Sequence, residues 1–97
     1  MKTVSFSESA KQDLEFLLSY LEETWSVRVK YAFIDELDLA LQTMAAFPDS
    51  FPSSAFKRGV RKCVVSKQTT LYYRTKKNEI EVIAIFDSRR DPGELKI

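Results

Sequence analysis

The sequence contains no histidine, one cysteine and only two glycines. Without histidine, no mechanism that needs an imidazole as acid, base or ligand is available. The single cysteine, Cys63, excludes an intramolecular disulfide and cannot build a structural zinc site by itself. The two glycines, Gly59 and Gly93, do not form a phosphate-binding loop. We therefore expect neither a metal nor a cofactor.

Long apolar runs are also missing. The longest candidate, residues 82–86, is far shorter than the roughly 20 apolar residues of a membrane helix, so we expect no membrane contact. The first six residues are followed at once by polar ones and are too short for a signal-peptide core. We expect a cytoplasmic protein. With 97 residues, 44% hydrophobic and 30% charged, the chain fits a single globular domain spanning residues 1–97.

The net charge of +1 conceals an uneven distribution along the chain. Residues 1–50 carry four basic and nine acidic side chains, a balance of −5. Residues 51–97 carry eleven basic and five acidic ones, a balance of +6. Individual lysines and arginines can simply solvate the outer face of a sheet, but a whole basic half indicates an acidic partner.

The first half predicts a strand and two helices. Residues 3–6 alternate in polarity like a short strand. Either Ser7 or Ser9 can cap the helix that follows, and Pro48 ends the second helix. The short link between them predicts an antiparallel hairpin. Two stripes at helical spacing should face the core: Ala10, Leu14, Leu17, Leu18, Leu21 and Trp25 in the first helix, and Val29, Phe33, Leu37, Ala40, Leu41, Met44 and Phe47 in the second.

The second half predicts three strands, at residues 60–65, 69–75 and 80–86. The links between them are short, which favours an antiparallel meander. The last strand is almost entirely apolar, as a central strand covered on both faces would be. Cys63 lies among apolar neighbours in the first of these strands, and we interpret it as a core residue rather than a nucleophile.

The remaining chemistry belongs to arginine and lysine. Period-2 alternation puts Arg61 and Lys62 on opposite faces of their strand. Antiparallel neighbours could gather several cations on the face away from the helices, where they would grip phosphates, stabilise charge in phosphoryl transfer, or bind an acidic protein. Tyr72 and Tyr73 could stack on bases or fill half-buried positions. The candidate binding residues are Arg61, Lys62, Lys67, Arg74, Arg89 and Arg90.

Several short motifs follow one another along almost the whole chain: Ala10-x-x-Asp13-Leu14, a proline loop before the meander, Val60-Arg61, Leu71-Tyr72-Tyr73-Arg74, Ile80-Glu81-Val82-Ile83 and Phe86-Asp87-Ser88-Arg89-Arg90-Asp91-Pro92. In this order and spacing they resemble the RelE/ParE superfamily of bacterial toxins. The resemblance implies an α+β fold of order β-α-α-β-β-β, with a helical hairpin packed on a twisted, mostly antiparallel four-stranded sheet. The first strand would lie beside the last.

The resemblance also implies a toxin of a type II toxin–antitoxin pair. Such a toxin halts growth until an antitoxin wraps it with an acidic, partly disordered segment that folds on binding. RelE-like members cleave mRNA in the ribosome, whereas ParE-like members poison DNA gyrase. RelE-like nucleases have an arginine early in the middle meander strand, where this sequence has Thr69 or Thr70. No tyrosine or histidine follows Arg90, and Asp87 stands where many relatives have histidine.

These departures favour a ParE-like toxin that binds gyrase through its sheet and C-terminal region, without catalysis of its own. One alternative is a ribosome-dependent mRNA endonuclease, whose catalytic candidates would be Arg61, Lys62, Arg74 and Arg89. Another is a degenerate member that only binds the antitoxin.

Overall fold

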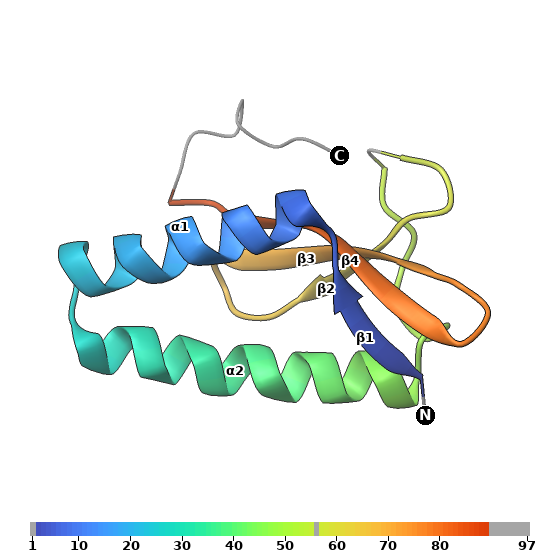
Figure 1. The fold of residues 1–97 in the computed structure, drawn as a ribbon, viewed down its shortest axis with the longest axis horizontal. Coiled ribbons are helices and arrows are strands. Elements are labelled where there is room, and N and C mark those ends of the chain that lie inside the picture. The colour runs from blue at the N-terminus through green and yellow to red at the C-terminus, as the bar shows by residue number, and fades with distance from the viewer. Residues whose placement is uncertain (1, 56, 90–97) are drawn as a thin grey trace.

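A four-stranded sheet with a helical hairpin on one face forms the fold in the computed structural model, which describes residues 2–55 and 57–89 (Figure 1). The elements are β1 (Thr3–Phe6), α1 (Glu8–Thr24), α2 (Val27–Ala46), β2 (Arg61–Val64), β3 (Thr69–Thr75) and β4 (Glu79–Asp87). Their order confirms the predicted α+β fold of order β-α-α-β-β-β.

Serine caps begin both helices. The Ser7 hydroxyl accepts a hydrogen bond from the Ala10 amide at 3.1 Å, so Ser7 rather than Ser9 starts α1. Ser26 caps α2 in the same way through the amide of Val29, also at 3.1 Å. Only two residues separate the helices, and this tight link folds them into the predicted antiparallel hairpin. Neither of the two described helices is long and apolar enough to cross a membrane.

The strand order in the sheet is β1-β4-β3-β2. The first strand lies beside the last, as predicted, and this is the one parallel pair among the described strands. The register of β3 on β4 shifts at a bulge: Tyr72 pairs with Ala84, but Tyr73 pairs with Val82. Ile83 is therefore an extra residue in β4, and the alternation of its side chains changes phase there.

The change of phase decides which residues of β4 lie under the helices. Ile80 and Val82, before the bulge, belong to the main core, and so does Ile85 after it. Asp87 follows Ile85 with the same phase and is 1% exposed. Uninterrupted alternation from Val82 would have turned Asp87 to the opposite face. The bulge thus brings a carboxylate to the helix-covered side of the sheet.

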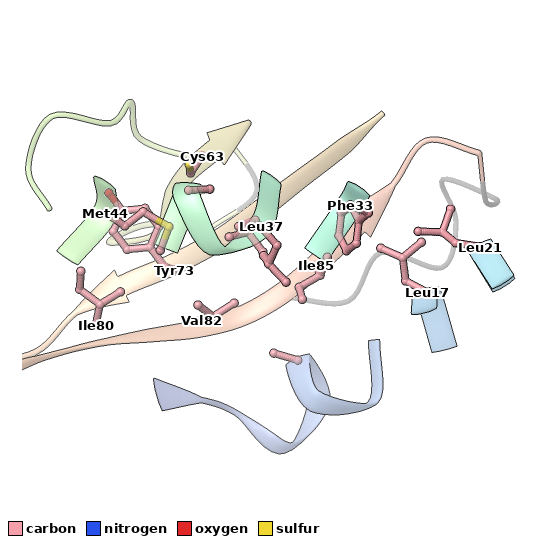
Figure 2. Packing of buried hydrophobic residues seen from close by; sticks show 13 residues of the cluster. Leu17, Leu21, Phe33, Leu37, Met44, Cys63, Tyr73, Ile80, Val82 and Ile85 are labelled. Carbon is pink, nitrogen blue, oxygen red and sulfur yellow. The ribbon is translucent and has the colours of Figure 1, made fainter. Parts of the chain in front are cut away.

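The main core lies between the hairpin and the sheet (Figure 2). Leu17, Leu21 and Phe33 lie toward one end of it, and Tyr73 and Ile80 lie toward the other. Cys63 is part of this core, as predicted, and burial raises the pKa of its thiol. The buried residues of the core are Ala10, Leu17, Leu21, Phe33, Leu37, Ala40, Met44, Cys63, Leu71, Tyr73, Ile80, Val82 and Ile85.

Two members of the predicted helical stripes are not in the core. Trp25 is 58% exposed and Phe47 is 61% exposed. Each is the residue that caps the C-terminal end of its helix, with backbone angles outside the helical range. Since helical periodicity no longer sets the direction of a side chain beyond the last helical residue, the assignment of both to the core was wrong.

Candidate functional site

The face of the sheet opposite the helices, here called the open face, carries two of the predicted cations. Cys63 in β2 and Tyr73 in β3 belong to the main core, so the alternating residues Lys62, Tyr72 and Arg74 point to the open face. Lys62 pairs with Tyr72 across the two strands. Lys62 and Arg74 are therefore diagonal neighbours, a relation that typically separates Cα atoms by about 7–8 Å.

The two cations differ in their surroundings. The Arg74 Nε donates a hydrogen bond to Glu81 Oε1 at 2.9 Å, and Lys76 Nζ lies 3.5 Å from the same oxygen. The hydrogen bond from Arg74 holds the pKa of the Glu81 carboxyl below its usual range. Lys62 is exposed and has no ion-pair partner within residues 2–55 and 57–89. Lys62 is thus a cation of this face that is available to a partner.

A second, smaller apolar cluster lies on the open face of the sheet. Strand β4 contributes to it because this nearly all-apolar strand places apolar side chains on both faces of the sheet. The cluster consists of buried Val60, Tyr72 and Ala84, with half-buried Ile83 and Phe86 packed against them. Val60, Tyr72 and Ala84 are 1–5% exposed, so the apolar area that this cluster offers to a partner is that of the half-buried Ile83 and Phe86.

Arg61 lies on the other side of the sheet. It pairs with core residue Tyr73 across the strands, and its Nη1 donates to the Phe51 carbonyl oxygen at 2.6 Å. The Tyr73 hydroxyl donates to the Pro48 carbonyl oxygen at 2.7 Å, and its ring meets that of Phe51 edge to face. Asp49 lies 3.9 Å from the Arg61 guanidinium. These contacts hold the loop after α2 against the sheet, so the Arg61 side chain has a structural role.

Arg89 is held by the only buried charged side chain among the described residues, Asp87. The Arg89 Nε and Nη2 donate to the two carboxylate oxygens at 2.7 and 2.5 Å, and Thr69 Oγ1 donates to Oδ2 at 2.8 Å. Burial by itself would raise the pKa of the Asp87 carboxyl. The hydrogen bonds from Arg89 and Thr69 outweigh burial and hold that pKa below its usual range.

The predicted cations therefore do not form one cluster. Lys62 and Arg74 share the open face, whereas Arg61 is on the helix-covered side. The rise of about 3.3 Å per strand residue separates Glu81, the partner of Arg74, from Asp87, the partner of Arg89, by roughly 20 Å. Lys67, in the turn between β2 and β3, lies at the same end as Arg89, and both line one cleft. Arg90 lies outside the described residues.

Comparison with known proteins now decides the family. The family model described as "ParE toxin of type II toxin-antitoxin system, parDE" matches residues 4–92, which is nearly the whole chain. The chain belongs to the ParE toxin family. No curated protein sequence matches this ParE-family toxin.

Solved structures share the fold at low sequence identity. The chromosomal ParDE toxin–antitoxin system from P. aeruginosa contains a chain with a TM-score of 0.75 and 13% identity, and the match covers 90% of this toxin and 96% of that chain. A YoeB/ParE toxin from Agrobacterium tumefaciens has a TM-score of 0.64 and 14% identity, with coverages of 88% and 96%. A chain of the YoeB–YefM complex from Staphylococcus aureus has a TM-score of 0.60 and 13% identity, and the match covers 89% of this toxin and 95% of that chain. These matches confirm the RelE/ParE-like fold.

The described part of this ParE-family toxin offers little for acid–base chemistry. Burial raises the pKa of Tyr73 to about 12 and raises that of Tyr72 as well, so both phenols stay protonated at neutral pH. The Glu81 and Asp87 carboxylates are bound to arginines. Within residues 2–55 and 57–89, no three potential metal ligands lie close enough together to hold an ion.

Proposed function

We propose that this ParE-family toxin arrests growth by binding and poisoning DNA gyrase, and that a cognate antitoxin neutralises it. The match of residues 4–92 to the ParE family carries the proposal. The dispersion of the cations supports it. A gyrase poison needs a binding surface, whereas a ribonuclease without histidine would need its arginines and lysines to converge on one phosphate.

The charge of the sheet half supports an acidic antitoxin. Residues 51–97 have a balance of +6. The open face carries the exposed cation Lys62 together with the half-buried apolar side chains Ile83 and Phe86. A segment with both acidic and apolar residues can cover such a face and can order itself while binding. The P. aeruginosa structure is of a ParDE toxin–antitoxin system and the S. aureus structure is of a YoeB–YefM complex, in agreement with a protein partner for this toxin.

The test is to induce the toxin without antitoxin and follow two readouts in the same cells. One readout is gyrase supercoiling together with covalent gyrase–DNA complexes, and the other is a map of cuts in translated mRNA. We expect gyrase-linked DNA breaks with intact mRNA. Codon-phased mRNA cuts with normal supercoiling would overturn the proposal. Unaffected growth in cells that contain the folded protein would indicate a member that only binds antitoxin.

Endonucleolytic cleavage of mRNA is the second candidate, and the shared position of Lys62 and Arg74 on the open face favours it. Two diagonal cations can contact consecutive phosphates of a single strand. Under this alternative, Lys62→Ala and Arg74→Ala each lower cleavage while the domain stays folded. Unchanged cleavage in both variants would exclude it.

A further inference from the structure

A cleft of about 310 Å³ lies at the end of the molecule where Arg89 is held. Its apolar lining comes from the helices, with Leu21 in α1 and Val29 and Phe33 in α2. Its polar lining comes from the turn between β2 and β3, with Lys67, and from Arg89 after β4. The volume suits one or two side chains of a partner rather than a small ion, because ligand pockets begin at about 300 Å³.

Arg89 is presented to this cleft in a fixed orientation. Its two bonds to Asp87 use Nε and Nη2, so Nη1 is not needed for the pair. The carboxylate is in turn fixed by Thr69, across the strand pair. A buried ion pair is generally a weak source of stability compared with apolar packing, but it does fix geometry. The hydrogen bonds among Thr69, Asp87 and Arg89 therefore hold the guanidinium in one orientation and leave Nη1 for another partner.

The positive and negative side chains of the cleft lie on different sides of it: Lys67 and Arg89 on the sheet side, and Glu36 on α2. Lys67, on the turn, has no ion-pair partner in the described ranges 2–55 and 57–89. Glu36 lines the cleft from α2 and lies close enough to raise the pKa of Arg89, after the larger effect of Asp87. An incoming carboxylate would be attracted to the side of Lys67 and Arg89 and repelled from the side of Glu36.

We propose that this cleft binds one segment of the antitoxin, in which a carboxylate side chain lies next to an apolar one. The carboxylate bonds to Arg89 Nη1 and Lys67, and the apolar side chain covers Leu21, Val29 and Phe33. Asp87 is then a positioning residue that acts through Arg89. The inference rests on the proposed toxin–antitoxin function and specifies where the acidic partner is recognised.

The test measures the dissociation constant of purified toxin variants for the cognate antitoxin at roughly 0.15 M salt, where distant charges are screened. Arg89→Gln should weaken binding about tenfold to a hundredfold, as loss of a charge-assisted hydrogen bond does. Lys67→Gln should weaken it about three- to tenfold, because its charge is at the rim. Glu36→Gln should tighten binding about two- to fivefold. Ala32→Glu, which puts a carboxylate into the cleft from an exposed helix position, should weaken it.

Lys11→Gln is the matched control, since it removes one charge near the far end of α1 and should bind like the wild type. The inference is wrong if Arg89→Gln and Lys67→Gln both bind within twofold of the wild type, or if Glu36→Gln binds more weakly. If Arg89→Gln melts early, Lys67→Gln and Glu36→Gln, both at exposed positions, still decide the question. Variant-dependent self-association of the toxin alone would mean that a second copy occupies the cleft, and would overturn the inference. Failure of the proposed function looks different, because wild type and control alike would then have no affinity for the antitoxin.

Discussion

Replacing Asp87 by asparagine, which exchanges one carboxylate oxygen for an amide nitrogen, should clearly lower the free energy of unfolding. Removing one member of a buried ion pair typically costs about 3–5 kcal/mol. Here the Arg89 side chain keeps 22% of its surface exposed, and asparagine still offers one acceptor oxygen to Thr69 or Arg89. We therefore expect a loss of about 1–3 kcal/mol, which corresponds to a fall in Tm of roughly 4–20 °C for a domain of this size.

The assay is urea unfolding of the wild type, Asp87→Asn, Arg89→Gln and the double variant at pH 7, read as a double-mutant cycle. The double variant should lose less than the sum of the two single changes, because no unpaired charge is left behind. Additive losses would mean that the two side chains do not stabilise each other.

The pH dependence gives a second measure of the same pair. The pKa of Asp87 is lowered in the folded state, so its contribution to stability is present above the unfolded value of about 3.9 and is lost as the pH falls through the folded value. The stability difference between wild type and Asp87→Asn should therefore be constant from neutral pH down to about pH 5, and should shrink below about pH 4. A difference that persists undiminished in acid would refute this account of the buried carboxylate.

Further predictions concern packing and reactivity. Leu17→Ala and Phe33→Ala should each lower the free energy of unfolding by about 2–5 kcal/mol, and an unmoved Tm for both would mean that the helix faces are misassigned. Trp25→Ala should change stability by less than about 1 kcal/mol in the same urea titration, because the indole is exposed. Arg61→Gln should cost about 1–2 kcal/mol and speed proteolysis in the loop after α2; cleavage there at the wild-type rate would argue against its fastening role. Cys63 should react slowly with a thiol reagent until the protein unfolds, and fast labelling of the native state would contradict its burial.

Sequence periodicity was sufficient for the elements and most of the core. The spacing of Leu17 and Leu21 located the buried face of α1, and alternation in β2 placed Arg61 and Lys62 on opposite faces. Periodicity failed at Trp25 and Phe47, where the backbone leaves the helix and side-chain direction depends on the cap.

The candidate site was harder to predict because it depends on register. Alternation alone cannot show that Arg74 and Arg89 lie near opposite ends of the sheet. The bulge at Ile83 has no sequence signal such as glycine, yet it turns Asp87 under the helices. From the sequence, Asp87 was noted only as the residue that stands where many relatives have histidine. The structure, in which Thr69 donates a hydrogen bond to Asp87, shows that Asp87 is the buried residue that holds Arg89.

The central claim is that this ParE-family toxin acts on gyrase by binding and not as a nuclease. Purified gyrase, supercoiled plasmid and the purified toxin test it most directly, with and without a molar excess of cognate antitoxin. The account predicts inhibited supercoiling and protein-linked double-strand breaks, both abolished by the antitoxin. Undisturbed supercoiling at every toxin concentration, together with cleavage of mRNA on translating ribosomes by the same preparation, would contradict it.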